Sequence, residues 1–294
     1  MSNMDLLKRS DRESSLPSNM YPQLGKDVSL HISPGYGLVL YGQPPKPLHV
    51  SRDTVNILAG CNGMQTVGEI LTDYVNAENR GNDVDVSEAI LTLTGLINER
   101  IVVLGENPKK VKVRITGSHT IFYPTSIQVE LTTNCNLSCS YCYRNSGAHE
   151  PGRLGTSKLL EILRVLSDNG LHSVELTGGE PLLHPDFIKI MRFCGERFSI
   201  GGLLTNGTLI TESLIRELLL FKEKMVISVS LDSHISDVHD ERRGLRGAFD
   251  KTTHGIRLLT QNGFFTRVSM SVDQDNWKDV EATLLLAHQL GASM

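Results

Sequence analysis

The sequence predicts an α/β protein in which a small α+β unit precedes a larger series of βα repeats. Residues 28–104 have the pattern of short strands followed by three helices, whereas strands and helices alternate from residue 125 onward. About five βα units fit the second part, and the chain ends at residue 294, where the next strand would begin. We therefore expect a partial (βα)6-type barrel that is truncated at its carboxyl end.

The composition is that of an ordinary globular protein. The chain has 294 residues, of which 39% are hydrophobic and 21% charged. Its net charge of −4 gives no general reason to bind nucleic acid or an anionic membrane. There is no apolar run of the roughly 20 residues that span a bilayer and no signal peptide, so we expect a cytoplasmic protein. Residues 1–25 are mostly polar and are expected to be disordered.

The first unit is expected to cover residues 26–106 and to be winged-helix-like. Ser51 can cap its first helix, and Thr66 and Glu69 have capping-box spacing for the second. Strands are predicted at 28–32, 36–41 and 48–50, helices after Ser51, after Thr66 and over 86–98, and a closing segment at 101–104. The polar, basic residues 107–124 read as a linker.

The second unit, residues 125–294, has the alternation expected of a parallel sheet covered by helices. Its strands are predicted at 127–131, 173–176, 200–204, 226–231 and 267–272. Its helices are predicted at about 157–168, 185–196, 211–223, 248–262 and 277–290.

Three of the five cysteines lie within eight residues, directly after the first strand of this unit. Cys135, Cys139 and Cys142 have the spacing C-x3-C-x2-C, and three thiolates on one loop can each ligate one iron of a 4Fe-4S cluster. The fourth iron then has no local cysteine and offers an open coordination site. Cys61 and Cys194 are isolated and read as small buried hydrophobes.

A zinc site is the alternative interpretation of these cysteines. Structural zinc usually takes four Cys or His ligands, often in paired knuckles. The nearest histidine, His149, is seven residues beyond Cys142, and the sequence has no second C-x2-C pair. The spacing therefore favours the iron–sulfur cluster.

With these motifs in place, residues 125–294 resemble the radical S-adenosylmethionine (SAM) superfamily, especially its peptide-maturase and sulfatase-maturase branch. The resemblance implies that the three cysteines hold the cluster and that Tyr141 lies against the adenine of SAM. Gly178, Gly179 and Glu180, followed by proline, match the GGEP motif that receives the methionyl amino group. Two glycines allow close backbone approach, and a carboxylate complements an ammonium.

The later motifs follow in the order that this branch shows. Asn206 ends the third strand, and Ser230 and Asp232 end the fourth. By resemblance Ser230 and Arg243 contact the SAM carboxylate or ribose, Asn206 belongs to the cofactor site, and Asp232 lines the substrate cavity. Arg242 is an equally available candidate for the role of Arg243. Related maturases also carry a Cys-rich (SPASM-type) extension with auxiliary clusters, of which this sequence shows nothing.

The first unit resembles PqqD-like domains, which bind the leader peptides of ribosomally synthesised, post-translationally modified peptides. The matching features are the strand pair, Ser51–Thr54 opening a helix, Cys61-Asn62-Gly63, Thr66–Ile70 and the closing segment 96–104. Such domains add an extended leader as a strand, which implies a groove between residues 46–50 and the helix over 86–98. A unit that only packs on the barrel is the alternative.

Together these features predict a radical SAM enzyme that cleaves SAM reductively and uses the 5′-deoxyadenosyl radical to modify a precursor peptide. A flavodoxin or ferredoxin is the expected reductant. Two alternatives stay open: an enzyme of small-molecule cofactor biosynthesis, which would share every motif of the second unit, and a non-catalytic leader-binding or regulatory protein. Nucleic-acid binding ranks last, because the only basic stretch, residues 109–114, lies in the predicted linker.

Overall fold

A computed structural model describes residues 16–42, 46–76, 86–144, 152–153 and 155–293. The chain divides into two compact units, Met1–Tyr123 and Pro124–Met294, each with its own hydrophobic core. No helix in these ranges is both long and apolar enough to cross a bilayer.

The first unit contains two small sheets. In the four-stranded sheet the order is β4-β3-β2-β6, so β4 is an edge strand, and β1 pairs antiparallel with β5 in the second sheet. The strands are β1 (Tyr21–Leu24), β2 (Ser29–Ser33), β3 (Tyr36–Tyr41), β4 (Lys46–Val50), β5 (Val102–Gly105) and β6 (Arg114–Gly117).

Three helices complete the first unit: α1 (Arg52–Gly60), α2 (Val67–Asn76) and α3 (Val86–Asn98). The predicted caps are confirmed. The Ser51 hydroxyl accepts a hydrogen bond from the Thr54 amide at 3.1 Å. Thr66 and Glu69 form a reciprocal capping box, in which each side chain accepts from the other residue's backbone amide.

Two predictions for the first unit need correction. Residues 1–25 were expected to be disordered, but β1 lies within them; residues 1–15 lie outside the described residues. The predicted linker 107–124 contains β6, which pairs parallel with β2. The reason is visible in the sequence: the basic residues of this stretch alternate with Val111, Val113 and Ile115, which is a strand pattern rather than that of a solvated linker.

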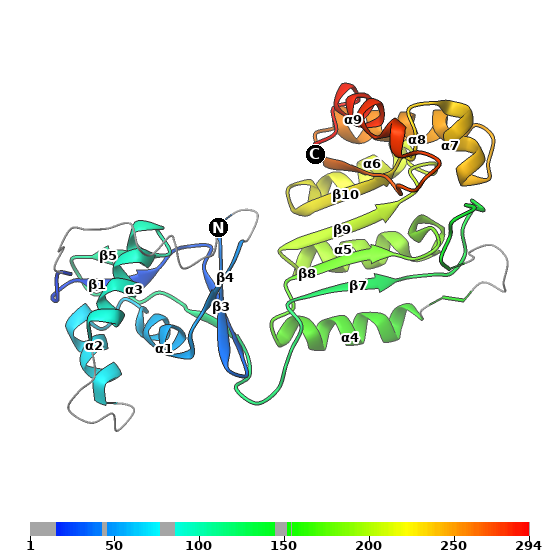
Figure 1. The fold of residues 1–294 in the computed structure, drawn as a ribbon. Coiled ribbons are helices and arrows are strands. Elements are labelled where there is room, and N and C mark those ends of the chain that lie inside the picture. Colours follow the sequence, from blue (N-terminus) through cyan, green and yellow to red (C-terminus); the bar gives the residue numbers. More distant parts are fainter. Residues whose placement is uncertain (1–15, 43–45, 77–85, 145–151, 154, 294) are drawn as a thin grey trace. The chain divides into compact units, whose positions relative to one another are not determined.

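The second unit is a parallel five-stranded sheet in the order β11-β10-β9-β8-β7, with helices packed against it (Figure 1). This confirms the predicted α/β fold with five βα units. The strands are β7 (Ser126–Glu130), β8 (Ser173–Thr177), β9 (Ile200–Thr205), β10 (Met225–Ser230) and β11 (Phe265–Ser269). The helices are α4 (Thr156–Asp168), α5 (Phe187–Arg197), α6 (Glu212–Leu218), α7 (Ser236–Arg243), α8 (Ala248–Gln261) and α9 (Val280–Gln289).

The sequence did not predict α7. Its eight residues are almost all polar or charged, so it has no apolar stripe from which a helix is recognised. Two predicted helices are also shorter in the structure than in the prediction, because a 3-10 turn replaces one end of each. The segment 211–223 passes from α6 into a 3-10 turn at Leu219–Lys224, and α9 follows a 3-10 turn at Trp277–Asp279.

Candidate functional site

The three-cysteine loop follows the carboxyl end of β7, the edge where parallel α/β sheets place their chemistry. All three cysteines are half-buried, and N–H donors point at two of the sulfurs. The Cys135 sulfur faces the Leu137 amide at 3.5 Å and Asn206 Nδ2 at 4.0 Å. The Cys139 sulfur faces Arg243 Nη1 at 3.8 Å. Donors aimed at sulfur favour the thiolate form, which is the form that ligates iron.

Burial, in contrast, favours the neutral thiol form of two of the loop cysteines. It raises the pKa of the Cys135 and Cys139 thiols, and the Arg243 guanidinium opposes that rise at Cys139. Burial also raises the pKa of Cys61 and of Cys194 to about 12, as expected for cysteines that serve as core residues. Cys135 and Cys139 therefore differ from Cys61 and Cys194 in having donors that favour ionisation.

Within the described residues, no three His, Cys, Asp or Glu side chains converge on a point where they could share one metal ion. A cubane cluster takes one cysteine on each of three irons, so its ligands need not meet at a single atom. His149, the histidine considered for zinc, lies outside the described residues. The half-buried loop with donors to its sulfurs thus fits the cluster.

The glycines of the GGEP motif run alongside the cysteine loop. The Gly179 amide donates to the Thr132 carbonyl at 2.7 Å, and the Glu180 amide to the Asn134 carbonyl at 2.8 Å. A β-carbon on Gly178 would lie 2.4 Å from the Thr132 oxygen, and one on Gly179 2.3 Å from the Asn134 oxygen. Gly178 also has a φ of +147°. Only glycine permits this approach.

Glu180 lies on the same motif, but its side chain is fully buried and turned toward β9. Its carboxyl group accepts hydrogen bonds from the Thr205 hydroxyl, the Asn206 amide and the Leu182 amide, at 2.8 to 3.1 Å. Burial raises its pKa to about 7 against these three donors. Protein donors thus reach both carboxylate oxygens, and the pairing of Glu180 with a ligand ammonium stays a prediction.

Asn206 connects the end of β9 to the cysteine loop. Its Nδ2 donates to Asn136 Oδ1 at 2.9 Å, and its own Oδ1 accepts from the amide and the hydroxyl of Thr208. Asn136 Nδ2 in turn donates to the Thr208 hydroxyl at 2.8 Å. The sequence indicated Asn206 alone, and its bond to Asn136 was missed because Asn136 lies 70 residues away in the chain.

Tyr141, Asp232 and Arg243 meet beside Cys139. The Tyr141 hydroxyl donates to the Asp232 carboxylate, and Arg243 Nε lies 2.9 Å from Asp232 Oδ2. The Asp232 side chain is fully buried and that of Arg243 is 8% exposed. Tyr141 and Arg243 thus enclose the Asp232 carboxylate, and its role in lining a substrate cavity stays a prediction.

Asp232 is fixed from several sides by residues that sequence reasoning missed. Its Oδ1 accepts from the Ser271 amide at 3.1 Å, and its backbone oxygen accepts from Asn276 Nδ2 at 3.0 Å. Its amide lies 3.2 Å from Nδ1 of the buried His239. Burial lowers the pKa of His239 to about 4, with the Arg243 charge acting in the same direction, so the ring is neutral and can accept that bond.

Arg242 has a different position from its neighbour. Its guanidinium forms a two-pronged ion pair with Asp273, at 3.1 and 2.9 Å, and lies 4.9 Å above the centre of the Tyr141 ring. Burial works to lower its pKa, but the Asp273 carboxylate outweighs this and the pKa is raised. Arg243 also lies over this ring, 5.7 Å from its centre, and in addition faces the Cys139 sulfur.

Ser230, the remaining predicted SAM contact, ends β10 and is half-buried. The same face of the sheet carries a polar row that the sequence did not reveal. Gln128 and Arg267 both donate to the Glu175 carboxylate, at 3.0 and 3.2 Å, and Arg267 also donates to Ser228. These side chains alternate with core residues along their strands, which indicates a polar inner face.

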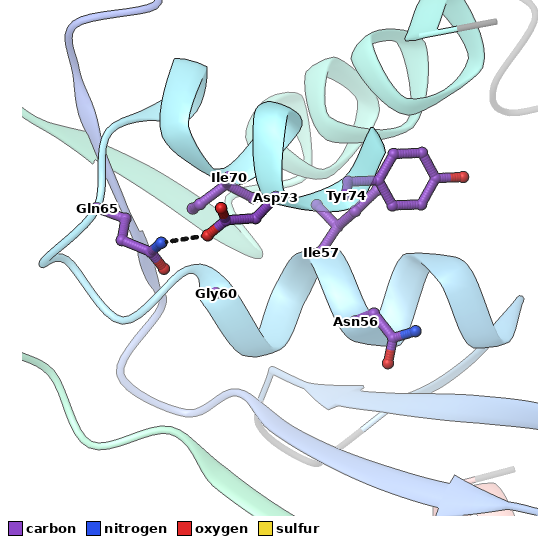
Figure 2. A pocket seen from close by; sticks show the side chains of 7 residues that line it. All are labelled: Asn56, Ile57, Gly60, Gln65, Ile70, Asp73 and Tyr74. Atoms are coloured by element: carbon purple, nitrogen blue, oxygen red, sulfur yellow. Dashed lines mark hydrogen bonds between the residues drawn. The ribbon is translucent and has the colours of Figure 1, made fainter. Parts of the chain in front are cut away.

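The first unit has a separate hollow of about 260 Å³ between α1 and α2. Its base is formed by Ile57 and Ile70, and Figure 2 shows Gln65 reaching across to Asp73, with which it forms a hydrogen bond of 2.6 Å. It is thus distinct from the predicted leader groove at β4 and α3.

Comparison with known proteins decides the family. The radical SAM superfamily profile matches residues 129–287, which include the cysteine loop, the GGEP motif and both arginines. The chain belongs to the radical SAM superfamily. Membership implies a 4Fe-4S cluster and SAM as its cofactors, in agreement with the donor set of the loop.

Individual superfamily members match over different lengths. The subtilosin biosynthesis protein AlbA of Bacillus subtilis is 28% identical over 281 residues, 93% of this chain and 63% of the relative. The AdoMet-dependent heme synthase of Methanosarcina barkeri is 34% identical over 170 residues, 58% of this chain and 48% of the relative. The chain thus spans between about half and two thirds of the length of these curated relatives.

Among solved structures, Streptococcus suis SuiB bound to SAM matches with a TM-score of 0.65 at 15% identity. The match covers 92% of this chain and 61% of SuiB. At this identity it establishes a shared fold.

Proposed function

We propose that this chain is the radical SAM part of a peptide maturase, which acts on a ribosomally synthesised precursor. The observation that carries the proposal is the length of the match to AlbA, which covers 93% of the chain and therefore includes the first unit. AlbA is a bacteriocin biosynthesis protein, and the structure of similar fold, SuiB, has also been solved with its precursor peptide SuiA.

In this proposal the second unit binds and orients the cofactors. When bound, the cluster and SAM supply the electron transfer and reductive cleavage that yield a 5′-deoxyadenosyl radical. Cys135, Cys139 and Cys142 would each hold one iron, and Gly178, Gly179 and Glu180 would receive the methionyl amino group. Tyr141, whose ring lies beneath the Arg242 guanidinium, would face the adenine. Ser230, Arg243 and Asn206 would complete the SAM site.

The first unit supplies the leader site. Among the described residues, no strand pairs with the outer side of β4, so its backbone is available for strand addition. Pro47 has no N–H and is tolerated where that side faces solvent, so the backbone of His49, two residues on, faces outward as well. On α3, the other side of the groove that the PqqD resemblance implies, Leu91 is 59% exposed and is therefore available for an apolar contact with a peptide. These features support a PqqD-like role for this unit.

A second candidate is a small-molecule enzyme, favoured by the 34% identity to the heme synthase. That match covers 58% of the chain, which is about the length of the second unit alone. The small-molecule function therefore does not explain what the first unit does. The peptide function explains both units.

A precursor peptide encoded beside the gene provides the test. The chain is reconstituted anaerobically with iron and sulfide and incubated with SAM, a reductant and that peptide, and the peptide mass is then measured. We expect a defined mass change that is absent when the leader half of the peptide is removed. An unchanged peptide under conditions in which SAM is cleaved would favour the small-molecule candidate.

The chemistry also suggests a reductant and a cellular location for this chain. We propose a one-electron donor of the flavodoxin or ferredoxin type as the physiological reductant. We also propose a cytoplasmic location, because reducing compartments keep cysteine thiols available for iron.

A further inference from the structure

The ion pair between Arg243 and Asp232 is placed where it can act on the cluster electrostatically. Arg243 Nη1 lies 3.8 Å from the Cys139 sulfur, while Nε of the same guanidinium lies 2.9 Å from Asp232 Oδ2. One guanidinium thus lies next to a cluster ligand on one side and a carboxylate on the other.

Both charges lie in a region that water screens poorly. Asp232 is fully buried and the Arg243 side chain is 8% exposed, so their fields at the sulfur are weakened little by solvent. The adjacent Arg242 is engaged with Asp273, whose side chain is 40% exposed. Arg243 and Asp232 therefore form a buried pair of opposite charges next to the Cys139 sulfur, and removing either charge changes the electrostatic potential at that sulfur.

The backbone holds this arrangement in place. The amides of Ser138 and Ser140 donate to the carbonyls of Arg243 and Arg242, at 3.1 and 3.0 Å. The cysteine loop is thereby tied to the end of α7 through bonds that do not depend on the side chain at position 243. A substitution there changes the charge while these bonds remain possible.

We propose that the buried Arg243–Asp232 pair sets the reduction potential of the cluster bound at Cys139. The guanidinium raises the potential, and the carboxylate limits that rise. Reduction adds one electron from an external one-electron donor to the cluster, with no bond made or broken. A nearby positive charge stabilises the added negative charge, and a nearby negative charge opposes it. The proposal rests on the superfamily's cluster and not on the peptide substrate.

The test is a redox titration of the reconstituted chain in the absence of SAM, with electron paramagnetic resonance as the measure of the reduced cluster. Asp232→Asn leaves the guanidinium unbalanced and should raise the equilibrium constant for reduction at least tenfold, which is about 59 mV for one electron. Arg243→Gln leaves the carboxylate unbalanced and should lower it at least tenfold. The double variant should lie closer to the parent than either single variant does.

Arg246→Gln is the matched control, because Arg246 lies three residues from Arg243 but is exposed. It removes the same charge and should leave the potential within about 10 mV of the parent, a small fraction of the 59 mV that corresponds to a tenfold change. SAM is absent from the titration, so a contact between Arg243 and SAM cannot produce the shifts.

A higher potential in Asp232→Asn together with a lower one in Arg243→Gln supports the proposal. If one of these variants loses its cluster, the predicted shift in the other is sufficient, and a shift of the opposite sign overturns the proposal. Unchanged potentials in both, or shifts of the same sign, overturn it. Loss of the cluster from both single variants but not from Arg246→Gln also overturns it, because the pair would then be needed for assembly rather than for tuning.

Discussion

The two units differ in how they present groups for binding. At the carboxyl edge of the second unit, protein groups engage the charged side chains: Arg243 pairs with Asp232, Arg242 pairs with Asp273, and the Thr205 hydroxyl donates to Glu180. In the first unit the available feature is the backbone of an edge strand, β4. Catalytic chemistry is thus carried by particular residue types, whereas proposed peptide recognition is carried by hydrogen-bonding groups that every residue has.

The largest expected effect tests whether the two units act separately. Replacing Cys135, Cys139 and Cys142 together with alanine should abolish iron binding, because the other two cysteines, Cys61 and Cys194, are buried core residues. Leader-peptide affinity should be unchanged. Iron content and the visible absorption of the reconstituted protein measure the first, and fluorescence anisotropy of a labelled leader measures the second. Retention of iron by the triple variant would mean that the cluster site is elsewhere.

The second effect is a pH dependence confined to the second unit. The pKa of Glu180 is raised by burial to about 7, from a usual value of 4.5. Its contribution to folding is therefore complete below pH 4.5 and is lost as the pH rises through 7. The loss amounts to about 3 kcal/mol.

Chemical denaturation of the metal-free chain at pH 5, 6, 7 and 8 checks this, with Glu180→Gln for comparison. The free energy of unfolding of the parent, relative to the variant, should fall between pH 5 and 7 and level off by pH 8. A difference that grows with pH would show that the carboxyl group is stabilised as the anion.

The third effect concerns the outward backbone of β4. His49→Pro removes an N–H that we place on the open side, so leader affinity should fall at least tenfold, or about 1.4 kcal/mol. His49→Ala is the matched control, because it removes the same ring and its contact with Tyr36 but keeps the N–H. Binding curves of a labelled leader peptide separate the two. Equal losses in both variants would mean that the side chain, not the strand edge, binds the leader.

The smallest effect is a helix cap in the first unit. Ser51→Ala removes the hydroxyl that accepts the Thr54 amide and should destabilise this unit by about 1 kcal/mol. Thermal unfolding followed by circular dichroism should show a lower midpoint for the first unit only. An equal shift in the transition of the second unit would show that the two units unfold together.

Sequence reasoning succeeded where a local pattern carries the structure. The strands of the second unit, the caps at Ser51 and Thr66, and the cysteine loop all follow from short-range spacing. It failed where the relevant partner is distant or polar. Strand β6 pairs with β2 some 85 residues away, and α7 has no apolar stripe. The surroundings of Asp232 could not be read from the sequence because its partners come from three separate segments: the cysteine loop, α7 and the loop after β11.

The central claim is that this chain performs radical SAM chemistry, and formation of 5′-deoxyadenosine tests it most directly. The anaerobically reconstituted chain is incubated with SAM and dithionite, with the precursor peptide present, and compared with the triple cysteine variant. The account predicts 5′-deoxyadenosine from the parent and none from the variant. A parent that holds its cluster and binds the peptide but yields no 5′-deoxyadenosine would contradict it.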